Sequence, residues 1–155
     1  MNMKTDSFLT VLKALYEYEV EYILIGGLAV ILHGVPRLTE DLDIFVTKDP
    51  TNLAKLKKAL RSVFHDESIE EMTNDDLVDY PVVRYGTPED YYIDIMDRVG
   101  EAFNYDDLAY EVIESHGFPI KVATIETLIK LKQGTIRQID KADVFLLTEK
   151  LKEKK

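Results

Sequence analysis

The segment from residue 22 to residue 46 constrains the fold of this chain more than any other part of the sequence. It opens with a short apolar run that stops at Gly26 and Gly27, as a buried strand entering a tight turn does. An apolar stretch with helical character follows. Apolar residues then alternate with Asp41 and Asp43, which places both carboxylates on one face of a second strand. The segment therefore predicts a strand, a glycine turn, a helix and a strand that carries two acids.

The rest of the chain predicts a mixture of helices and strands in a single domain spanning residues 1–155, because no linker-like stretch divides it. We expect an α/β (α+β) fold, with a small mixed β-sheet flanked by helices and a helical C-terminal element at about 124–152. In the first half of the chain we expect a helix over 7–19, a helix that starts at Pro50 behind the cap residue Asp49, and a loop around a short helix over 65–80. In the second half we expect a hairpin of 81–85 and 91–96, a helix over 105–116 that ends at Gly117, and an extended piece over 118–122. A helix from Thr124 to about 132 and a last helix from about 138 complete the prediction.

Charge and composition exclude or disfavour several classes of function for this chain. The 155 residues include no cysteine, which excludes disulfides, zinc–thiolate sites and a cysteine nucleophile. The net charge is −10, and residues 65–114 alone hold 16 acidic and 2 basic side chains. Such an acidic middle repels nucleic acid phosphates and disfavours broad duplex binding. The longest uncharged run, 22–36, is too short and too broken by glycine to span a bilayer, so we expect a cytoplasmic protein with no membrane partner.

The acidic pair predicts a site for a hard cation. Asp41 and Asp43, two residues apart on one strand face, have Cα atoms about 6–7 Å apart, which lets both ligate one Mg²⁺ ion or a pair of ions. Crowded carboxylates are costly without a counter-ion. Asp94 is a third carboxylate inside a strand-like apolar run, and the free N–H groups at Gly26 and Gly27 favour phosphate. Taken singly, each feature is also compatible with a solvent-facing strand edge or an ordinary turn.

Together these motifs resemble the nucleotidyltransferase superfamily of the DNA polymerase beta type. Its signature is an apolar residue, Gly, Gly or Ser, a spacer of nine to thirteen residues, and then Asp, an apolar residue, Asp or Glu, and another apolar residue. Here it is Ile25-Gly26-Gly27, thirteen residues, and Asp41-Leu42-Asp43-Ile44. The longer pattern Gly-Gly-x-Ala-x-x-x-His-Gly-x-x-Arg-x-Thr-x-Asp-x-Asp looks most like small stand-alone transferases, among them the AbiEii-type toxins of toxin–antitoxin systems.

The resemblance extends downstream to a Lys…Arg-x-x-Asp-x-x-Asp pattern, which is similar to Lys132, Arg137, Asp140 and Asp143 of this chain. One departure is visible, because relatives often have Ala-Gly before the arginine where this chain has Thr-Ile. The likeness therefore touches most of the chain from Tyr22 onward, and its first motif is the most specific.

The resemblance implies a polymerase-beta-like fold and a metal-dependent reaction. A nucleoside monophosphate would pass from an NTP to an acceptor hydroxyl on a tRNA end, a protein or a small molecule, with release of pyrophosphate. Asp41 and Asp43 would hold two Mg²⁺ or Mn²⁺ ions, and Asp94 would complete the acceptor-side metal and help take the hydroxyl proton. The remaining implied contacts are to phosphate, from Gly26, Gly27, Lys132 and Arg137, and from Arg37 and Thr39, which would otherwise order their loop.

Four alternatives stay open at this point. The chain is compatible with a catalytically inactive nucleotide-binding regulatory or antitoxin module that acts through a protein partner, a cognate toxin or antitoxin. A metal-dependent phosphohydrolase using the same carboxylates is a weaker alternative, because the metal-binding histidines common in such enzymes are missing. A solvated helix face is the alternative for Lys132 and Arg137, and a helix-end position is favoured over catalysis for His33.

Overall fold

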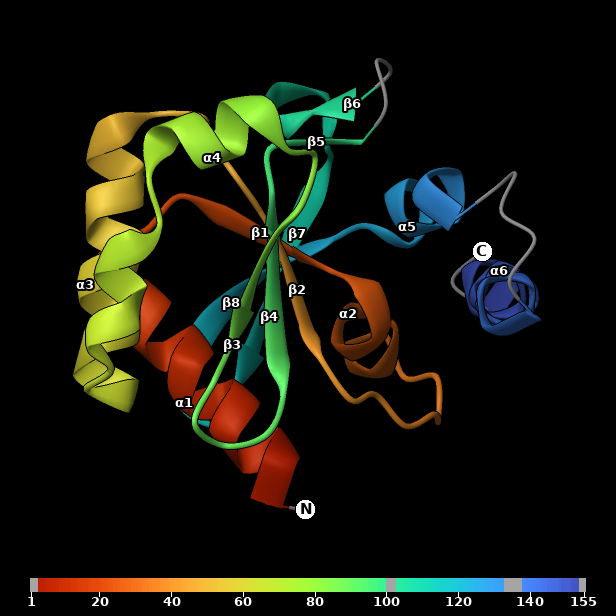
Figure 1. Ribbon diagram of the computed structural model, residues 1–155. Helices are drawn as coiled ribbons and strands as arrows, with labels where there is room; N and C mark the ends of the chain where they lie inside the picture. Colours follow the sequence, from red (N-terminus) through yellow and green to blue (C-terminus); the bar gives the residue numbers. More distant parts are fainter. Residues whose placement is uncertain (1–2, 100–102, 133–137, 154–155) are drawn as a thin grey trace.

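A mixed β-sheet organises the chain, which a computed structural model describes over residues 3–99, 103–132 and 138–153 (Figure 1). The sheet consists of Tyr22–Ile25 (β1), Leu42–Val46 (β2), Val83–Gly86 (β3), Tyr92–Met96 (β4), Tyr110–Ser115 (β7) and Phe118–Ala123 (β8). Its strand order is β3-β4-β2-β1-β8-β7. The pairs β1/β8 and β2/β4 are parallel, and the other neighbours are antiparallel.

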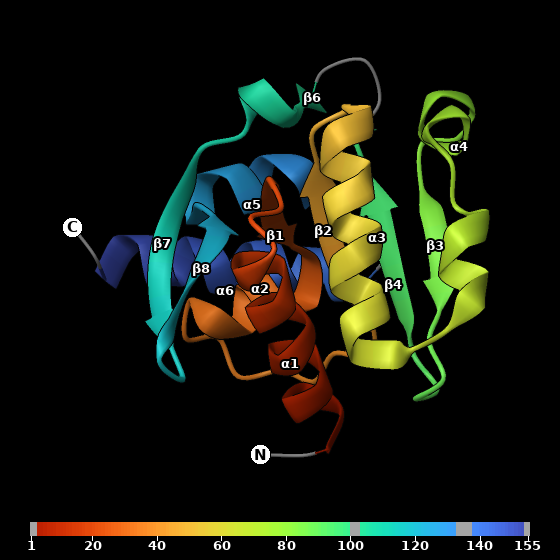
Figure 2. The same ribbon diagram turned by 90° about the vertical axis from the view of Figure 1, so that its left-hand side faces the viewer.

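Helices cover both faces of the sheet (Figure 1). Met3–Glu17 (α1) and Pro50–Phe64 (α3) pack together on one face, and Gly26–Leu32 (α2), Ile125–Lys132 (α5) and Gln138–Glu153 (α6) lie on the other. Figure 2 looks onto the α1/α3 face and shows α5 and α6 behind the sheet. The shorter elements are Glu67–Glu71 (η1), Asn74–Asp79 (α4), Arg98–Val99 (β5), Phe103–Asn104 (β6) and Tyr105–Asp107 (η2). No helix in the ranges described here is long and apolar enough to cross a membrane.

The helices on both faces explain why the central strands are almost wholly apolar. All of β1 is buried, and β2 is buried except at Asp43. From α1, the side chains of Phe8, Leu12 and Leu15 reach the core at the helical spacing that the sequence predicts. Asp43 is therefore a polar residue at the margin of a tightly buried sheet, and its side chain needs a specific environment.

The predicted fold class is confirmed, and several local predictions are correct in detail. Asp49 caps α3 by accepting a hydrogen bond from Thr51 N at 3.0 Å, with Pro50 in the first turn. Strands β3 and β4 form the expected hairpin, although its five-residue connection is 87–91 rather than 86–90. Thr124 caps α5, accepting from Thr127 N at 3.2 Å, and the helical C-terminal element is present.

The predicted helix over 105–116 is wrong. The structure has the short helical turn η2 there, followed by strand β7, which pairs with β8 in register from Tyr110 opposite Ala123 to Ser115 opposite Phe118. Side chains along β7 alternate between exposed and half-buried, as they do on a sheet edge. The strands are joined by His116 and Gly117, both with positive φ (53° and 88°), as in a type I′ hairpin turn. Gly117 therefore closes a hairpin rather than ending a helix.

Two boundaries also differ from the prediction. Helix α2 begins at Gly26 itself, whereas the sequence predicted a glycine turn before a helix starting near residue 28. Helix α1 spans Met3–Glu17 instead of 7–19. The earlier start of α2 matters most for the site, because it brings the first helical turn directly to the end of β1.

The β7–β8 turn gives a test of the corrected hairpin. Replacing Gly117 with alanine should lower the free energy of unfolding by about 1 kcal/mol, because the left-handed backbone conformation is less favourable for alanine than for glycine by about that amount. No atom lies within 4 Å of the added Cβ, so the loss comes from the backbone alone. In urea denaturation, Gly117→Asn should lose less than Gly117→Ala, since asparagine tolerates this conformation better. Equal stability of all three proteins would contradict the turn.

Candidate active site

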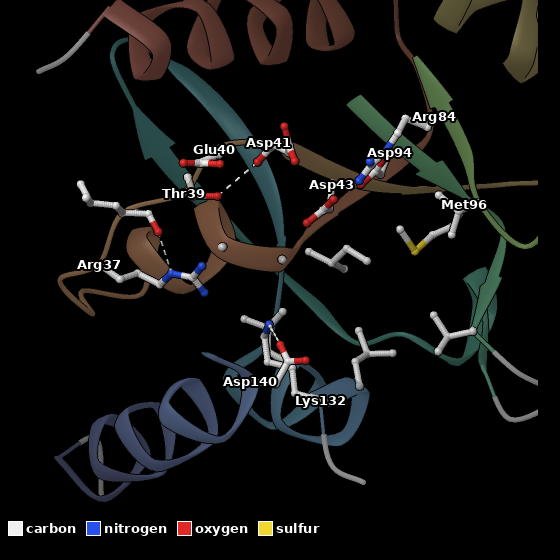
Figure 3. Close-up of a pocket in the computed structure, with 18 residues that line it drawn as sticks. Arg37, Thr39, Glu40, Asp41, Asp43, Arg84, Asp94, Met96, Lys132 and Asp140 are labelled. Atoms are coloured by element: carbon white, nitrogen blue, oxygen red, sulfur yellow. Dashed lines mark hydrogen bonds and ion pairs between the residues drawn. The ribbon is translucent and has the colours of Figure 1, made fainter. Parts of the chain in front are cut away.

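A cavity of about 640 Å³ opens beside the sheet, between the loop before β2 and helices α5 and α6 (Figure 3). This volume lies within the usual range for small-molecule sites. The predicted site residues that line it are Gly26, Gly27, Arg37, Thr39, Asp41, Asp43, Asp94 and Lys132. The structure thus brings together residues from four separate parts of the chain. Arg137, also predicted, lies outside the described residues.

Three carboxylates form one wall of this cavity. In the parallel pair β2/β4, Asp43 lies directly opposite Asp94. Asp41 immediately precedes β2, and its Oδ1 accepts a hydrogen bond from Tyr92 N at 3.0 Å. The acids come from two strands that are about fifty residues apart in sequence but are neighbours in the sheet, so their proximity is a product of strand order.

The crowding of these acids is electrostatically unfavourable, and it raises the pKa of Asp43. Burial raises its pKa, and repulsion by Asp94, a hydrogen bond with the Asp94 carboxyl and repulsion by Asp41 raise it further. The pKa reaches about 7, although the charge of Lys132 acts in the opposite direction. A carboxylate in this position favours any nearby positive charge, and a divalent cation would remove most of the cost.

The donor set fits a hard cation such as Mg²⁺, since carboxylate oxygens are the ligands that this ion prefers. Among the residues that the structure describes, however, no group of three histidine, aspartate or glutamate side chains is arranged to hold a metal ion as it stands. In this structure Asp41 accepts a hydrogen bond from a backbone N–H, and Asp94 accepts one from an arginine. Asp41, Asp43 and Asp94 are therefore suitable ligands by type and position, but two of them have other partners.

Arg84 is the partner of Asp94, and no sequence motif predicted this residue. Its Nε lies 2.8 Å from Oδ1 of Asp94 and its Nη2 lies 3.2 Å from Oδ2, so the contact is bidentate. The arginine also lines the cavity. The charge pattern could have indicated Arg84, because Arg84 and Arg98 are the two basic residues in the acidic stretch 65–114.

Gly26 and Gly27 allow the backbone to pack closely against Asp43, Thr39 and Arg37. Gly26 has φ +74°, and a Cβ at this position would lie 2.1 Å from Oδ2 of Asp43. A Cβ on Gly27 would lie 2.5 Å from Oγ1 of Thr39 and 3.2 Å from Cζ of Arg37. The glycine pair therefore lets the backbone at the start of α2 approach both the acidic wall and the loop before β2.

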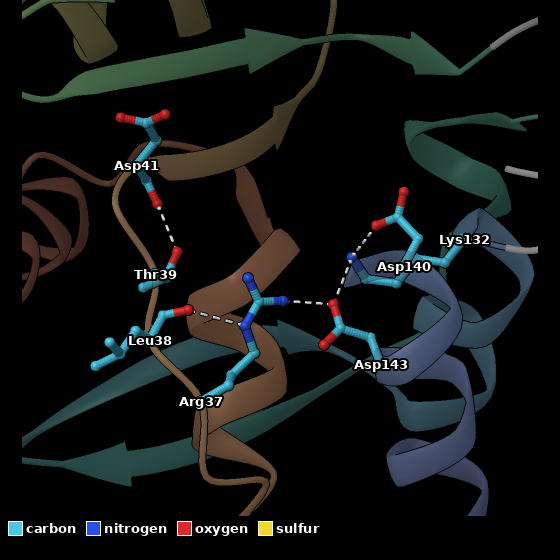
Figure 4. Close-up of polar contacts among 7 residues, drawn as sticks. All are labelled: Arg37, Leu38, Thr39, Asp41, Lys132, Asp140 and Asp143. Atoms are coloured by element: carbon cyan, nitrogen blue, oxygen red, sulfur yellow. Dashed lines mark hydrogen bonds and ion pairs between the residues drawn. The ribbon is translucent and has the colours of Figure 1, made fainter. Parts of the chain in front are cut away.

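The basic side of the cavity is held by buried acids from α6 (Figure 4). Lys132 Nζ lies 3.1 Å from Asp140 Oδ1 and 3.1 Å from Asp143 Oδ2. Arg37 pairs with the same Asp143 carboxylate, and its Nε donates to its neighbour's carbonyl, Leu38 O, at 3.0 Å. Because the Lys132 side chain is only 12% exposed, the alternative of a solvated helix face is wrong for this residue.

Two further polar residues have local structural contacts. Thr39 Oγ1 donates to Asp41 O at 3.2 Å, which orders the chain as it enters β2. His33 is buried at the C-terminal end of α2, where its Nε2 lies 2.8 Å from Ala123 O. It does not line the cavity, which agrees with the favoured helix-end interpretation.

Several solved structures share the fold of this chain. The chain is similar to lincosamide antibiotic adenylyltransferase LnuA, lincomycin-bound (18% identity, TM-score 0.65, covering 96% of this chain and 98% of that chain). It is also similar to ANT(2″)-Ia in complex with adenylyl-2″-tobramycin (15%, 0.56, 97% and 92%). A third is an antigenic nucleotidyltransferase-like protein from Paracoccidioides brasiliensis (19%, 0.54, 94% and 75%). At these identities the similarity shows a shared fold.

The family itself follows from the sequence. The chain belongs to the nucleotidyl transferase AbiEii toxin family of type IV toxin–antitoxin systems, whose model matches residues 10–132. This confirms the predicted resemblance and identifies the protein as a nucleotidyltransferase. No curated protein sequence matches the chain.

The contact between Gly26 and Asp43 gives a prediction with a matched control. Gly34 also has a positive φ (+96°), but a Cβ there would meet the end of the flexible Lys150 side chain at 3.3 Å. Gly34→Ala should therefore cost about 1–2 kcal/mol of backbone strain. Gly26→Ala should cost about 1–3 kcal/mol more, because the carboxylate of Asp43 is in the way.

Urea denaturation of both variants measures the difference between these two costs. Equal losses would mean that the Asp43 side chain moves away freely, and that the close approach of Gly26 does not position it.

Proposed function

We propose that this protein transfers a nucleoside monophosphate from an NTP to an acceptor hydroxyl and releases pyrophosphate, in a reaction that depends on divalent metal ions. The observation that carries the proposal is the pairing of Asp43 with Asp94 at the wall of a cavity that also holds Arg37 and Lys132. Acids that favour a cation and bases that favour phosphate thus share one space of a size suited to a nucleotide.

Asp41, Asp43 and Asp94 would hold Mg²⁺ or Mn²⁺, two ions in all. When bound, such ions neutralise phosphate charge and lower the pKa of an acceptor hydroxyl. In this proposal an oxygen of Asp94 takes the hydroxyl proton, as a general base within hydrogen-bond reach. The raised pKa of Asp43 supports the assignment, because a bound metal ion offsets both the burial and the repulsion that raise it.

The phosphates would lie against the opposite side of the cavity. Lys132 and Arg37 supply positive charge there, and the buried acids of α6 hold both side chains in place before a nucleotide arrives. Gly26 and Gly27 let the backbone come close to the triphosphate, and Thr39 orders the adjoining loop. A phosphate contact from Arg137 stays a prediction from sequence.

The acceptor is the open part of the proposal. The names of two similar structures mention a lincosamide antibiotic and adenylylated tobramycin, which are small molecules. A tRNA end and a protein side chain are the other acceptors that the family resemblance implies. The toxin–antitoxin family also supports a protein partner, which we propose to be a cognate antitoxin.

The transfer itself can be tested with NTPs labelled either on the α-phosphate or on the γ-phosphate. Incubated with Mg²⁺ and a cell extract, the protein should transfer the α-label to an acceptor and should not transfer the γ-label. Asp43→Asn should lower this activity by at least about 100-fold, because it removes a metal-binding charge. Asp49→Asn is the matched control, since Asp49 caps α3 outside the cavity and asparagine caps equally well.

The outcomes separate the rival functions. Nucleotide binding with no transfer by the wild-type protein would favour a regulatory binding module. Release of free phosphate without label transfer would favour a phosphohydrolase. Either result would overturn the proposed transfer.

Metal dependence has a test that needs no substrate. A ligand that binds only the folded state raises stability by RT ln(1 + [L]/Kd), so metal at about 100 times Kd adds about 2.7 kcal/mol. Millimolar Mn²⁺ should therefore raise the Tm of the wild-type protein and of Asp49→Asn. The Tm of Asp43→Asn should not change in the same thermal scan, and an equal rise in all three proteins would place the ion elsewhere.

A further inference from the structure

We propose that Arg84 competes with the divalent ion for Asp94 and is a built-in counter-ion that must be released before the metal site is complete. The inference rests on the proposed function, because it concerns the ions that Asp43 and Asp94 would bind. It assigns Arg84 as a positioning residue that sets how tightly those ions load.

Arg84, Asp94 and Asp43 form one row across three neighbouring strands. Arg84 on β3 is in register with Asp94 on β4, which is in register with Asp43 on β2. Figure 3 shows the three side chains close together at the cavity wall. Asp94 can therefore pair either with Arg84 on its outer side or with a metal cation on its inner side, which it would share with Asp43.

The arginine contact uses both oxygens of Asp94. Nε reaches one at 2.8 Å and Nη2 reaches the other at 3.2 Å, in the two-point geometry typical of a strong guanidinium–carboxylate pair. A metal ion shared with Asp43 needs at least one of these oxygens as a ligand. It would also bring two positive charges close to the guanidinium, and the two cations would repel each other.

Exposure indicates which partner moves. The Arg84 side chain is 55% exposed, whereas that of Asp94 is 13% exposed, so the arginine can swing away while the carboxylate stays in the wall. While it is paired with Asp94, the guanidinium also lies over the ring of Tyr92, 4.5 Å from its centroid. Because Arg84 also lines the cavity, incoming phosphate offers it another anionic partner.

The test is a Mn²⁺ titration of the nucleotide-free protein, followed by electron paramagnetic resonance of the unbound ion. Arg84→Gln should bind Mn²⁺ about two- to fivefold more tightly than the wild-type protein, the range expected from losing one partly exposed ion pair. Arg84→Lys should fall between them, because lysine keeps the charge but cannot make the two-point contact.

Arg61→Gln is the matched control. Arg61 pairs with Glu70 at 2.9 Å and is 56% exposed, which matches the exposure of Arg84, but it does not line the cavity. Its loss should leave the Mn²⁺ affinity unchanged. General loosening of the fold would weaken metal binding, so a gain in affinity confined to the Arg84 variants is the signature of competition.

Unchanged or weaker Mn²⁺ binding by folded Arg84→Gln would overturn the inference. If that variant does not fold, an Arg84→Lys affinity equal to that of the wild-type protein overturns it instead. Asp43→Asn separates this result from the proposed function. If Asp43→Asn binds Mn²⁺ as well as the wild-type protein does, the metal site itself is wrong and both ideas fail. If Asp43→Asn loses binding and Arg84→Gln gains none, only the role of Arg84 fails.

Discussion

Asp43 and Asp94 face each other on neighbouring parallel strands, and the cavity is organised around the repulsion between these two carboxylates. Burial limits screening by water, so the folded chain places cations on either side of the pair. Arg84 meets Asp94 from the outer strand, while the charge of Lys132 partly offsets that of Asp43 from the helical side. Gly26 makes room for the arrangement, because any side chain there would collide with the Asp43 carboxylate. The acidic wall is thus compact, and its negative charge is only partly balanced by neighbouring cations. A metal ion binds well under this condition.

The C-terminal helix completes the cavity through charge as well as through packing. Asp140 and Asp143 are almost fully buried in α6, and they hold Lys132 and Arg37 beside the space where phosphate would lie. Buried ion pairs are costly to break, so this cluster fixes where α6 sits relative to the loop before β2. The family match ends at residue 132, before these two acids. The part of the chain that carries the family signature therefore depends on a following helix to place its basic residues.

Much of the local structure could be predicted because it depends on near neighbours in sequence. The alternation of Asp41 and Asp43 with apolar residues gave strand β2, and the Asp49-Pro50 pair gave the start of α3. The predicted helix over 105–116 is wrong because His116 and the following Gly117 form a two-residue hairpin loop, which a glycine-ended helix resembles in the linear sequence. Alternating exposure along β7 follows from pairing with β8, and that partner lies on the far side of the turn.

The sequence by itself determined the family, the fold class and the residue types of the site, because periodicity, capping residues and motif spacing are properties of the linear chain. Only the tertiary structure decided which of these groups meet. The bidentate pair of Arg84 with Asp94 requires β3 to lie beside β4, and the contact between Arg37 and Asp143 joins residues 106 positions apart. Strand order and helix docking set such contacts through burial of the whole core, and no local pattern contains them.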